Sequence, residues 1–431
     1  MSKKAIYRSK LGSLEDALEM ICSGDVIATP CYGNEPRHFL ARLHTIAPRV
    51  KNVLLWLGNT MENYPVASDP NLAGHIDFVG NFFGRDCRTA HELKRISLSP
   101  SHLSAAGMTI VRTRRPTIFV ASVAPMDDEG YFCMSVDLEY SLECLEAADK
   151  VIFEVNSNLP VTYGETKIPV EVADLVYEMD NSMPYAPEIL STPVEEAIAG
   201  YVASLVNDGD CIQLGIGGTP NAVGRALMSK HDLGIHTEMI TSSMGELLKC
   251  GAVNNSRKNF MPGKTVGAFA WGNQELYDYI NGNEDVMLRK CSWVNDPFVI
   301  SQNDNMVSIN TALQVDLAGQ VCSETIGTKQ YSGTGGASDF AYGAYRSKGG
   351  KGIIALASTA KKGTVSKIQP ILTPGSVVTI SRNITDYIVT EYGIAKMRDC
   401  TMRQRVEGLI SIAHPDFREE LRKQANKLML W

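Results

Sequence analysis

Several signals by which protein classes are recognised are missing from this sequence. No apolar run approaches the length that spans a bilayer, and the N-terminus, MSKKAIYRSK, is basic but lacks the apolar core of a signal peptide. A formal net charge of −7 gives little support to a nucleic-acid partner. We therefore expect a cytoplasmic protein with neither a membrane nor a nucleic-acid partner.

Patterns for disulfides, metals and mononucleotides are also absent. The ten cysteines contain no CxxC pair and are scattered, which predicts free thiols in a reducing compartment. The eight histidines show no HExxH or other ligand spacing, so we expect no metal site. The loop GxxxxGK followed by Ser or Thr, which binds mononucleotides, does not occur.

What the sequence does contain is an alternation of strand-like and helix-like segments over 431 residues, enough for two or three domains. This order predicts the α/β class, with parallel-rich sheets flanked by helices. The stretch INTALQVDLAGQVCSE, residues 309–324, alternates apolar and polar residues and predicts an antiparallel insertion. The expected strands are 117–123, 150–155, 265–271, 352–358 and 377–382, and the expected helices are 136–148, 193–206, 219–229 and 402–411.

One pattern occurs twice along the chain. GDVIATPCYGNEPRHFLARL (24–43) and GDCIQLGIGGTPNAVGRAL (209–227) both begin Gly-Asp-x-Ile and continue with a short apolar stretch. Each then has Gly-x-x-Pro and an amphipathic helix that ends in Leu. The repetition predicts two related α/β halves.

The junction between the halves is expected within residues 184–195. Thr192 there can cap a helix, and Glu195 three residues later completes the pattern of a capping box. We accordingly expect an N-terminal domain over 1–187 and a C-terminal domain over 188–431.

The second copy of the pattern indicates a strand, a glycine turn and a helix, which together point backbone N–H groups at a negative group. A dinucleotide fingerprint requires G-x-G-x-x-G or Ala, but Pro220 stands at the third glycine position. A purely structural turn is a second interpretation of Gly215, Gly217 and Gly218. A third is an oxyanion hole, formed by N–H groups just before a helix.

Glu238 lies near the end of the next expected strand, GIHTEMI. In a parallel sheet the carboxyl ends of adjacent strands lie together, so Gly217, Gly218 and Glu238 are expected to converge. Glu238 is then a nucleophile beside an oxyanion hole. A solvent-facing Glu on a half-buried strand is the ordinary alternative, and a Glu that binds ribose hydroxyls of NAD is another.

A third motif is YSGTGGASDFAYGAYRSKGGKGIIALAS, residues 331–358, which is followed by STAKKGTVSK. Glycines interleaved with basic residues before a strand suit a long phosphorylated ligand that lies along the backbone. Each lysine taken alone is more ordinarily part of a solvated surface. The basic residues are Arg346, Lys348, Lys351, Lys361, Lys362 and Lys367.

GIGGTP, HTEM and GGASDFAYGAYRSKGGKGI, in this order, resemble the acetyl-CoA hydrolase/transferase family of CoA-transferases. FFGRDCR, VAPMDDEGYF and EVNSNLPVTYG extend the resemblance into the first half. It implies that Glu238 is the catalytic nucleophile, that the loop from Gly215 to Gly218 forms an oxyanion hole, and that the long motif binds coenzyme A. The residues so implied to bind CoA are Gly335, Gly336, Asp339, Gly343, Lys348, Gly349, Gly350 and Lys351.

The resemblance also implies a fold of two Rossmann-like, CoA-transferase-type α/β domains, in agreement with the internal repeat. Its reaction moves CoA from a short-chain acyl-CoA to a free carboxylate, such as 4-hydroxybutyrate or butyrate with acetate, through a glutamyl-CoA thioester on Glu238. CoA is a substrate, and neither a permanently bound cofactor nor a metal is implied. A homodimer or a larger even homo-oligomer is implied as well.

Three other functions stay open at this point. A short-chain acyl-CoA hydrolase needs only water at the thioester, and an NAD-dependent oxidoreductase and a non-catalytic CoA sensor are the remaining alternatives. Two departures from the family pattern bear on the substrate. Ala337 follows Gly336 where the family usually has Gln, and SSMG (242–245) replaces a frequent Ser-Asp-Gly. The acyl group and the acceptor acid are therefore not predicted.

Overall fold

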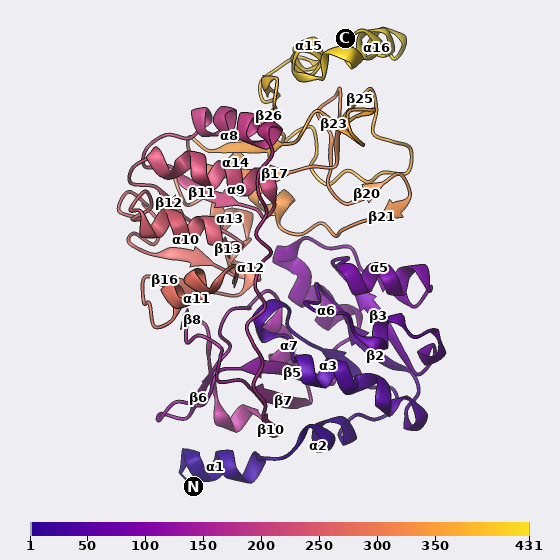
Figure 1. Cartoon of the computed structure of the whole chain (residues 1–431), viewed down its shortest axis with the longest axis vertical. Coiled ribbons are helices and arrows are strands. Elements are labelled where there is room, and N and C mark those ends of the chain that lie inside the picture. The colour runs from indigo at the N-terminus through magenta and orange to yellow at the C-terminus, as the bar shows by residue number, and fades with distance from the viewer. Residues whose placement is uncertain (1, 431) are drawn as a thin grey trace. The chain divides into compact units, whose positions relative to one another are not determined.

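The computed structural model describes residues 2–430, which form two compact units (Figure 1). The first unit contains the chain up to Ala186 and the segment Gly267–Trp293, and the second contains Pro187–Val266 and the chain from Val294 onward. The chain passes between the units within β14 (Thr265–Gly267) and α12 (Cys291–Val294).

The segment Gly267–Trp293, which our division places in the C-terminal domain, packs with the first unit for a backbone reason. Leu138 N–H donates to the Ala268 carbonyl and Ala270 N–H donates to the Val136 carbonyl. The Phe269 ring stacks on Tyr32 with centroids 4.8 Å apart. A segment from later in the sequence therefore completes the first unit. A single boundary near residue 187 does not describe this arrangement.

The first unit is built on a seven-stranded parallel sheet in the order β10-β7-β5-β1-β2-β3-β4. Every residue of β5 is buried, as expected for a strand covered on both faces. The order reverses at β1, between β2 and β5. The strands are β1 (Val26–Ala28), β2 (Val53–Trp56), β3 (Ile76–Gly80), β4 (Ile96–Leu98), β5 (Ile118–Val123), β6 (Tyr131–Cys133), β7 (Lys150–Val155), β8 (Tyr163–Gly164), β9 (Lys167–Pro169), β10 (Leu175–Glu178), β15 (Phe269–Trp271) and β16 (Val286–Leu288). The α-helices are α1 (Lys3–Lys10), α2 (Leu14–Glu19), α3 (Arg37–Leu43), α4 (Pro65–Ser68), α5 (Arg85–Glu92), α6 (Ala106–Thr113), α7 (Ser141–Ala147) and α11 (Gln274–Ile280).

The second unit is built on a six-stranded sheet in the order β12-β11-β17-β22-β26-β27, parallel except for β27. Its order reverses at β11, between β12 and β17. Helices α8, α9 and α10 pack in a row (Figure 1). The strands are β11 (Cys211–Leu214), β12 (Gly234–Ile235), β13 (Met239–Thr241), β17 (Met306–Thr311), β18 (Gln314–Asp316), β19 (Val321–Cys322), β20 (Thr325–Ile326), β21 (Lys329–Gln330), β22 (Lys351–Ala355), β23 (Thr359–Ala360), β24 (Val365–Ser366), β25 (Ile368–Gln369), β26 (Tyr387–Thr390) and β27 (Gly393–Lys396). The α-helices are α8 (Pro193–Leu205), α9 (Gly218–Ala226), α10 (Ser242–Lys249), α13 (Pro297–Ile300), α14 (Ala337–Arg346), α15 (Met402–Ile412) and α16 (Pro415–Lys427).

Several expected elements are confirmed. The strands expected at 117–123 and 150–155 are β5 and β7. The helix expected at 193–206 is α8, whose capping box joins Thr192 and Glu195. The antiparallel insertion is the β18–β19 hairpin. The parallel-rich α/β class is therefore confirmed, whereas the internal repeat stays a prediction.

Two expected elements are wrong. Only Ser141–Ala147 of the helix expected at 136–148 is helical, because residues 136–138 form the backbone bonds to the segment Gly267–Trp293 described above. The strand expected at 377–382 does not form, since its pairing is limited to an isolated bridge between Val321 and Ile380.

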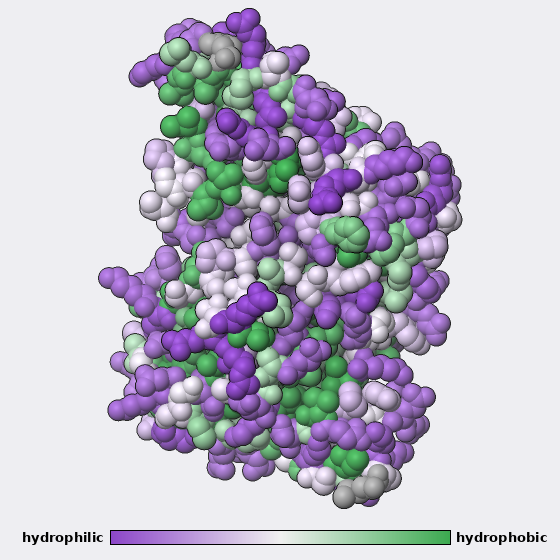
Figure 2. All heavy atoms as spheres, turned by 180° about the vertical axis from the view of Figure 1, so that it is seen from behind, coloured by the Kyte–Doolittle hydropathy of each residue, from purple (hydrophilic) through white to green (hydrophobic). Residues whose placement is uncertain are grey.

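The surface on one face of the molecule is largely polar. On the face shown in Figure 2, hydrophilic residues cover most of the surface and hydrophobic ones gather in smaller patches. Within residues 2–430, no helix has both the length and the apolar character that a membrane crossing needs.

Candidate active site

Glu238 lies in the second unit, in the short break between β12 and β13. β12 pairs in parallel with β11, with Gly234 opposite Cys211. The segment after β12 therefore leaves the same edge of the sheet as the glycine turn after β11, as the sequence predicts for a crevice at the carboxyl ends of strands.

Two donors hold the Glu238 carboxylate. Asn295 Nδ2 donates to Glu238 Oε2 over 2.7 Å, and the Gly336 backbone N–H donates to the same carboxylate. Asn295 is fully buried, whereas Glu238 stays partly accessible. The carboxylate is thus held by two donors and remains partly accessible to a second reactant.

Gly336 is glycine at this site for a spatial reason. A Cβ built on it would lie 1.7 Å from Glu238 Oε2 and 2.3 Å from Asn295 Nδ2, so a larger residue would displace this hydrogen bond. Gly336 also caps the N-terminus of α14. The start of the long glycine motif therefore packs directly on the predicted nucleophile.

The surroundings of Glu238 shift its acidity. Burial, with a smaller contribution from the Asp339 carboxylate, raises the pKa of its carboxyl to about 7 against the opposing effect of the donors Asn295 and Gly336. A carboxylate with a raised pKa is more basic than an exposed one, and near neutral pH about half of it is anionic.

Backbone conformation and packing explain two of the glycines in the turn between β11 and α9. Gly217 has φ 117°, a left-handed conformation that favours glycine, and α9 begins at Gly218. A Cβ on Gly218 would lie 2.1 Å from Glu195 Oε1, in the capping box of α8. Gly215 has only Pro220 nearby, at 3.9 Å. Packing accounts for Gly218, and the predicted oxyanion role of this turn stays a prediction.

The structure divides the long glycine motif. Gly335, Gly336 and Asp339 lie at the beginning of α14, and Asp339 is close enough to act on the pKa of Glu238. Gly343 lies in the body of α14, where a Cβ would come within 2.4 Å of Ile300 Cγ2. Its small size is needed for packing of α14 against the α13 segment.

The end of the motif lies at the opposite edge of the sheet, before β22 begins. Lys348 is exposed there, and its carbonyl accepts a bond from Asn305 N–H, just before β17. Lys351 Nζ donates to the Leu205 carbonyl and to Asp210. Gly349 and Gly350 form the turn between these lysines. This placement gives no support to the predicted CoA contacts of residues 348–351.

A cavity lies at the same sheet edge as Glu238, and none of the site residues predicted from the sequence is among its lining residues. It has a volume of about 430 Å³ and is lined by residues that follow β11, β17, β22 and β26. This size suits a small-molecule ligand. The lysines of STAKKGTVSK were the sequence signal for it. Its lining residues include Thr219, Thr311, Lys361, Lys362, Lys367 and Glu391.

Two of these lysines occupy an unusual turn. Lys361 and Lys362 have φ values of 49° and 58°, and Gly363 N–H donates to the Ala360 carbonyl over 3.1 Å. With Gly363 (φ 88°) they form three consecutive left-handed positions in the four-residue loop between β23 and β24, a conformation that favours Gly, Asn or Asp. A left-handed non-glycine residue costs about 1 kcal/mol or more. Two positive charges therefore stand where the backbone favours other residues.

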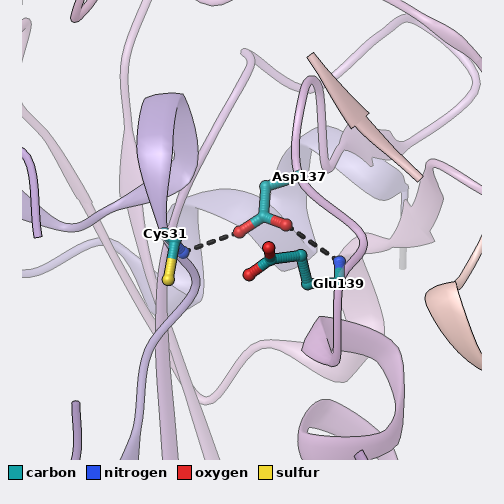
Figure 3. A group of neighbouring side chains, drawn as sticks. All are labelled: Cys31, Asp137 and Glu139. Carbon is teal, nitrogen blue, oxygen red and sulfur yellow. Dashed lines mark hydrogen bonds between the residues drawn. The ribbon is translucent and has the colours of Figure 1, made fainter. Parts of the chain in front are cut away.

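One group within residues 2–430 combines metal-ligand side chains: Cys31, Asp137 and Glu139 in the first unit (Figure 3). Asp137 already accepts bonds from the backbone N–H groups of Cys31 (2.6 Å) and Glu139 (2.8 Å). Burial raises the pKa of the Cys31 thiol well above its usual range, which opposes the thiolate that metals bind. The group fits a role in holding two loops together better than a metal site.

Comparison with known proteins adds independent information. Family models for the acetyl-CoA hydrolase/transferase N-terminal domain and C-terminal domain match residues 1–187 and 272–425. A 4-hydroxybutyrate coenzyme A transferase of Clostridium kluyveri is 45% identical over 99% of this chain and 100% of that protein. A succinyl-CoA:cyclohexane-1-carboxylate CoA transferase of Geobacter metallireducens is 42% identical over 98% of this chain and 96% of that protein.

Solved structures agree with these matches. RipA from Yersinia pestis superposes with a TM-score of 0.94 at 35% identity and covers both chains completely. A 4-hydroxybutyrate CoA-transferase from Porphyromonas gingivalis has a TM-score of 0.81 at 33% identity, with 99% of each chain covered.

Proposed function

This chain belongs to the acetyl-CoA hydrolase/transferase family, and on this premise we propose that Glu238 is the nucleophile of its reaction. The chain is a CoA-transferase that acts on short-chain acyl-CoAs, like the relatives it matches along its length. The proposed reaction moves CoA to a free carboxylate, with 4-hydroxybutyrate or butyrate and acetate as the acids to test first.

The reaction proceeds in four balanced additions and eliminations. Glu238 attacks the acyl-CoA carbonyl and expels CoA thiolate, which leaves an acyl–glutamyl anhydride. The thiolate then attacks the glutamyl carbonyl and releases the free acid, so that Glu238 carries CoA as a thioester. An acceptor carboxylate attacks this thioester, and the thiolate finally takes the acyl group from the new anhydride. Covalent catalysis thus divides one difficult exchange into easier steps.

The hydrogen bond from Asn295 to Glu238 Oε2, at 2.7 Å, carries this proposal, with the Gly336 N–H as a second donor to the carboxylate. With Oε2 bound by Asn295, Oε1 is the oxygen that we assign to the attack. When the glutamyl carbonyl is itself attacked, negative charge develops on Oε2, and Asn295 stabilises it. One such donor contributes about 3 kcal/mol to the transition state.

The cavity at this sheet edge is our proposed place for the phosphorylated part of CoA. Lys361 and Lys362 supply positive charge at its rim, and the helix N-terminus at Gly218 adds backbone donors near Thr219. Binding energy from this distant part of the substrate would press the thioester against Glu238.

Three further features belong to the proposal. The exchange between a thioester and a carboxylate is nearly thermoneutral, so it needs neither ATP nor a metal or redox cofactor. We propose a cytoplasmic protein that works as a homodimer or a larger even homo-oligomer. Size-exclusion chromatography with light scattering would test the assembly directly.

The testing experiment is the intact mass of the protein after mixing with acetyl-CoA alone, followed by peptide mapping. We expect a CoA adduct on Glu238 that added butyrate discharges as butyryl-CoA. An adduct that decays in water as fast as in butyrate would instead assign an acyl-CoA hydrolase. If no adduct forms, the nucleophile assignment fails, and binding of NADH becomes the next measurement.

A further inference from the structure

His236 is fully buried two residues before Glu238, on the strand segment that leads to it. Its Nε2 lies 2.9 Å from the Val294 carbonyl oxygen. A carbonyl only accepts hydrogen bonds, so Nε2 carries the proton and donates. Val294 is the residue immediately before Asn295.

Two parallel links therefore join the same pair of segments. His236 bonds the Val294 carbonyl, and Glu238, two residues after His236, meets Asn295, one residue after Val294, at 2.7 Å. Asn295 lies in the short connection between α12 and α13, each of only four residues. Helices this short do not fix a side chain by themselves, so the His236 link is an anchor for Asn295.

The charge of His236 is constant at working pH. Burial, together with the nearby Lys258 ammonium, lowers its pKa to about 3. Lys258 is itself buried and donates to the carbonyls of Ile235 (2.9 Å) and Lys264 (2.7 Å). The Phe340 ring of α14 also lies near the imidazole, with the ring centroids 6.2 Å apart. The imidazole thus stays a neutral donor while Glu238 titrates.

We propose that His236 is a positioning residue for CoA transfer, which acts through Val294 to hold Asn295 against the Glu238 carboxylate. The inference rests on the proposed function, because it concerns the alignment of the same nucleophile. Glutamine is the informative replacement, since its side-chain amide reproduces the position of Nε2 and still donates. Leucine fills similar space without a donor.

The experiment compares His236→Leu and His236→Gln with wild type, and His231→Leu as a matched control at an exposed histidine. Each protein is mixed with acetyl-CoA, and the rate of the CoA adduct, kcat, KM and the kinetic pKa are measured. We expect His236→Leu to form the adduct about 100-fold more slowly, because misplacement of a reacting group by about 1 Å has effects of this size. Its KM should change little, its kinetic pKa should rise, and His236→Gln should recover most of the rate.

A double-mutant cycle separates positioning from general stability. If His236 acts through Asn295, His236→Leu should add little to the loss of adduct-formation rate already caused by Asn295→Ala, whereas independent effects would multiply the two fold-losses. Fold-losses that multiply in the double variant, or equal rates for His236→Leu and wild type, would overturn the inference. If His236→Leu does not fold, His236→Asn takes its place, because its shorter amide does not reach the Val294 carbonyl.

The same measurements distinguish this inference from the proposed function. A wild-type protein that forms no CoA adduct would defeat both. A wild-type protein that forms the adduct at a rate unaffected by His236→Leu would defeat only the role of His236.

Discussion

Each unit has a strand, a turn and a helix at the place where its sheet reverses its strand order. The turn is buried by side chains in the first unit, which we call the filled crevice, and accessible in the second, which we call the open crevice. In the first unit β1 leads through a turn to α3, and every residue from 27 to 36 is buried. In the second unit β11 leads through Gly217 to α9, and the turn is accessible, with Ile216 42% exposed. Ligands of open α/β sheets bind at this reversal point.

The filled crevice shows what happens when such a point serves the fold alone. Tyr32 stacks on Phe269, Asp137 joins two loops, and Gly33 has no room for a Cβ, which would lie 2.5 Å from Val136 Cγ2. In the second unit, the strand beside the turn, β12, is followed instead by Glu238. Function therefore resides in the side chains at the crevice and not in the strand–turn–helix element itself.

The largest expected difference between the units follows from removing a carboxylate in each. Glu238→Ala should lower kcat by about 10⁴-fold or more, as loss of a covalent nucleophile does. It should leave the unfolding midpoint near that of wild type. Asp137→Ala, in the first unit, should lower the unfolding midpoint because two backbone N–H groups lose their acceptor.

Steady-state transfer from acetyl-CoA to butyrate and thermal unfolding, measured on both variants, test this contrast. Turnover by Glu238→Ala within tenfold of wild type would contradict the assignment of the nucleophile.

Adding a methyl group at a close contact in each unit gives the next largest contrast. Gly336→Ala pushes a Cβ into the Glu238–Asn295 hydrogen bond and should lower kcat by about 10²-fold or more. Gly33→Ala pushes a Cβ against Val136 and should instead cost about 1–3 kcal/mol of unfolding free energy, as overpacking does. Urea titration and kcat measured side by side distinguish the two outcomes, and an active Gly336→Ala protein would argue against the proposed geometry.

Asn295→Ala tests the donor separately from the space around it. We expect a loss of about 10²-fold in kcat, since one donor to the developing charge is removed. The kinetic pKa of Glu238 should also rise, because Asn295 is the donor that lowers it most. Asn295→Asp is the companion variant, because a second carboxylate beside Glu238 should raise that pKa further. A pH–rate profile that does not move in either variant would contradict a role for Asn295 in setting the pKa of Glu238.

Comparison of these residues with the sequence shows what was predictable. Glu238 stood in a recognisable motif, but Asn295 is 57 residues away in an ordinary loop, and the two meet only through the fold. Residues 335–351 form one continuous motif, yet the ten residues of α14 span about 15 Å and carry its end to the other edge of the sheet. The CoA contacts of residues 348–351 therefore stay a prediction without support from this placement, whereas the helix expected at 136–148 is wrong because long-range backbone pairing decided the structure there.

A change at Lys361 and Lys362, in the loop at the open crevice, should have a smaller effect, which is favourable for stability and unfavourable for substrate binding. Replacing Lys361-Lys362 by Asn-Gly places residues that tolerate positive φ at both positions and should stabilise the protein by about 1 kcal/mol. The same change removes two positive charges and should raise KM for acetyl-CoA about tenfold, with kcat nearly unchanged. Lys348→Gln, at the far sheet edge, is the matched control and should leave KM unaltered. Equal effects of both variants on KM would mean that neither position identifies the CoA site.

The smallest expected effect is the dependence of stability on pH, where the open crevice again differs from the filled one. Burial raises the pKa of Glu238 to about 7, above the value of about 4.5 in an unfolded chain. The stabilising contribution of its protonated form is therefore complete below pH 4.5 and is lost as pH rises through 7. Glu238→Gln, studied without substrate, should match the free energy of unfolding of wild type at pH 4.5 and exceed it at pH 8 by up to about 3 kcal/mol.

Asp137 is the matched position in the first unit, because burial also raises the pKa of its carboxyl to about 7. Asp137→Asn should be no more stable than wild type at either pH, because one amide oxygen replaces two carboxylate acceptors. Urea unfolding at the two pH values decides between these outcomes. A Gln variant that gains nothing at pH 8 would mean that the ionised Glu238 is fully compensated by its donors, and activity should then persist well below pH 7 instead of falling there.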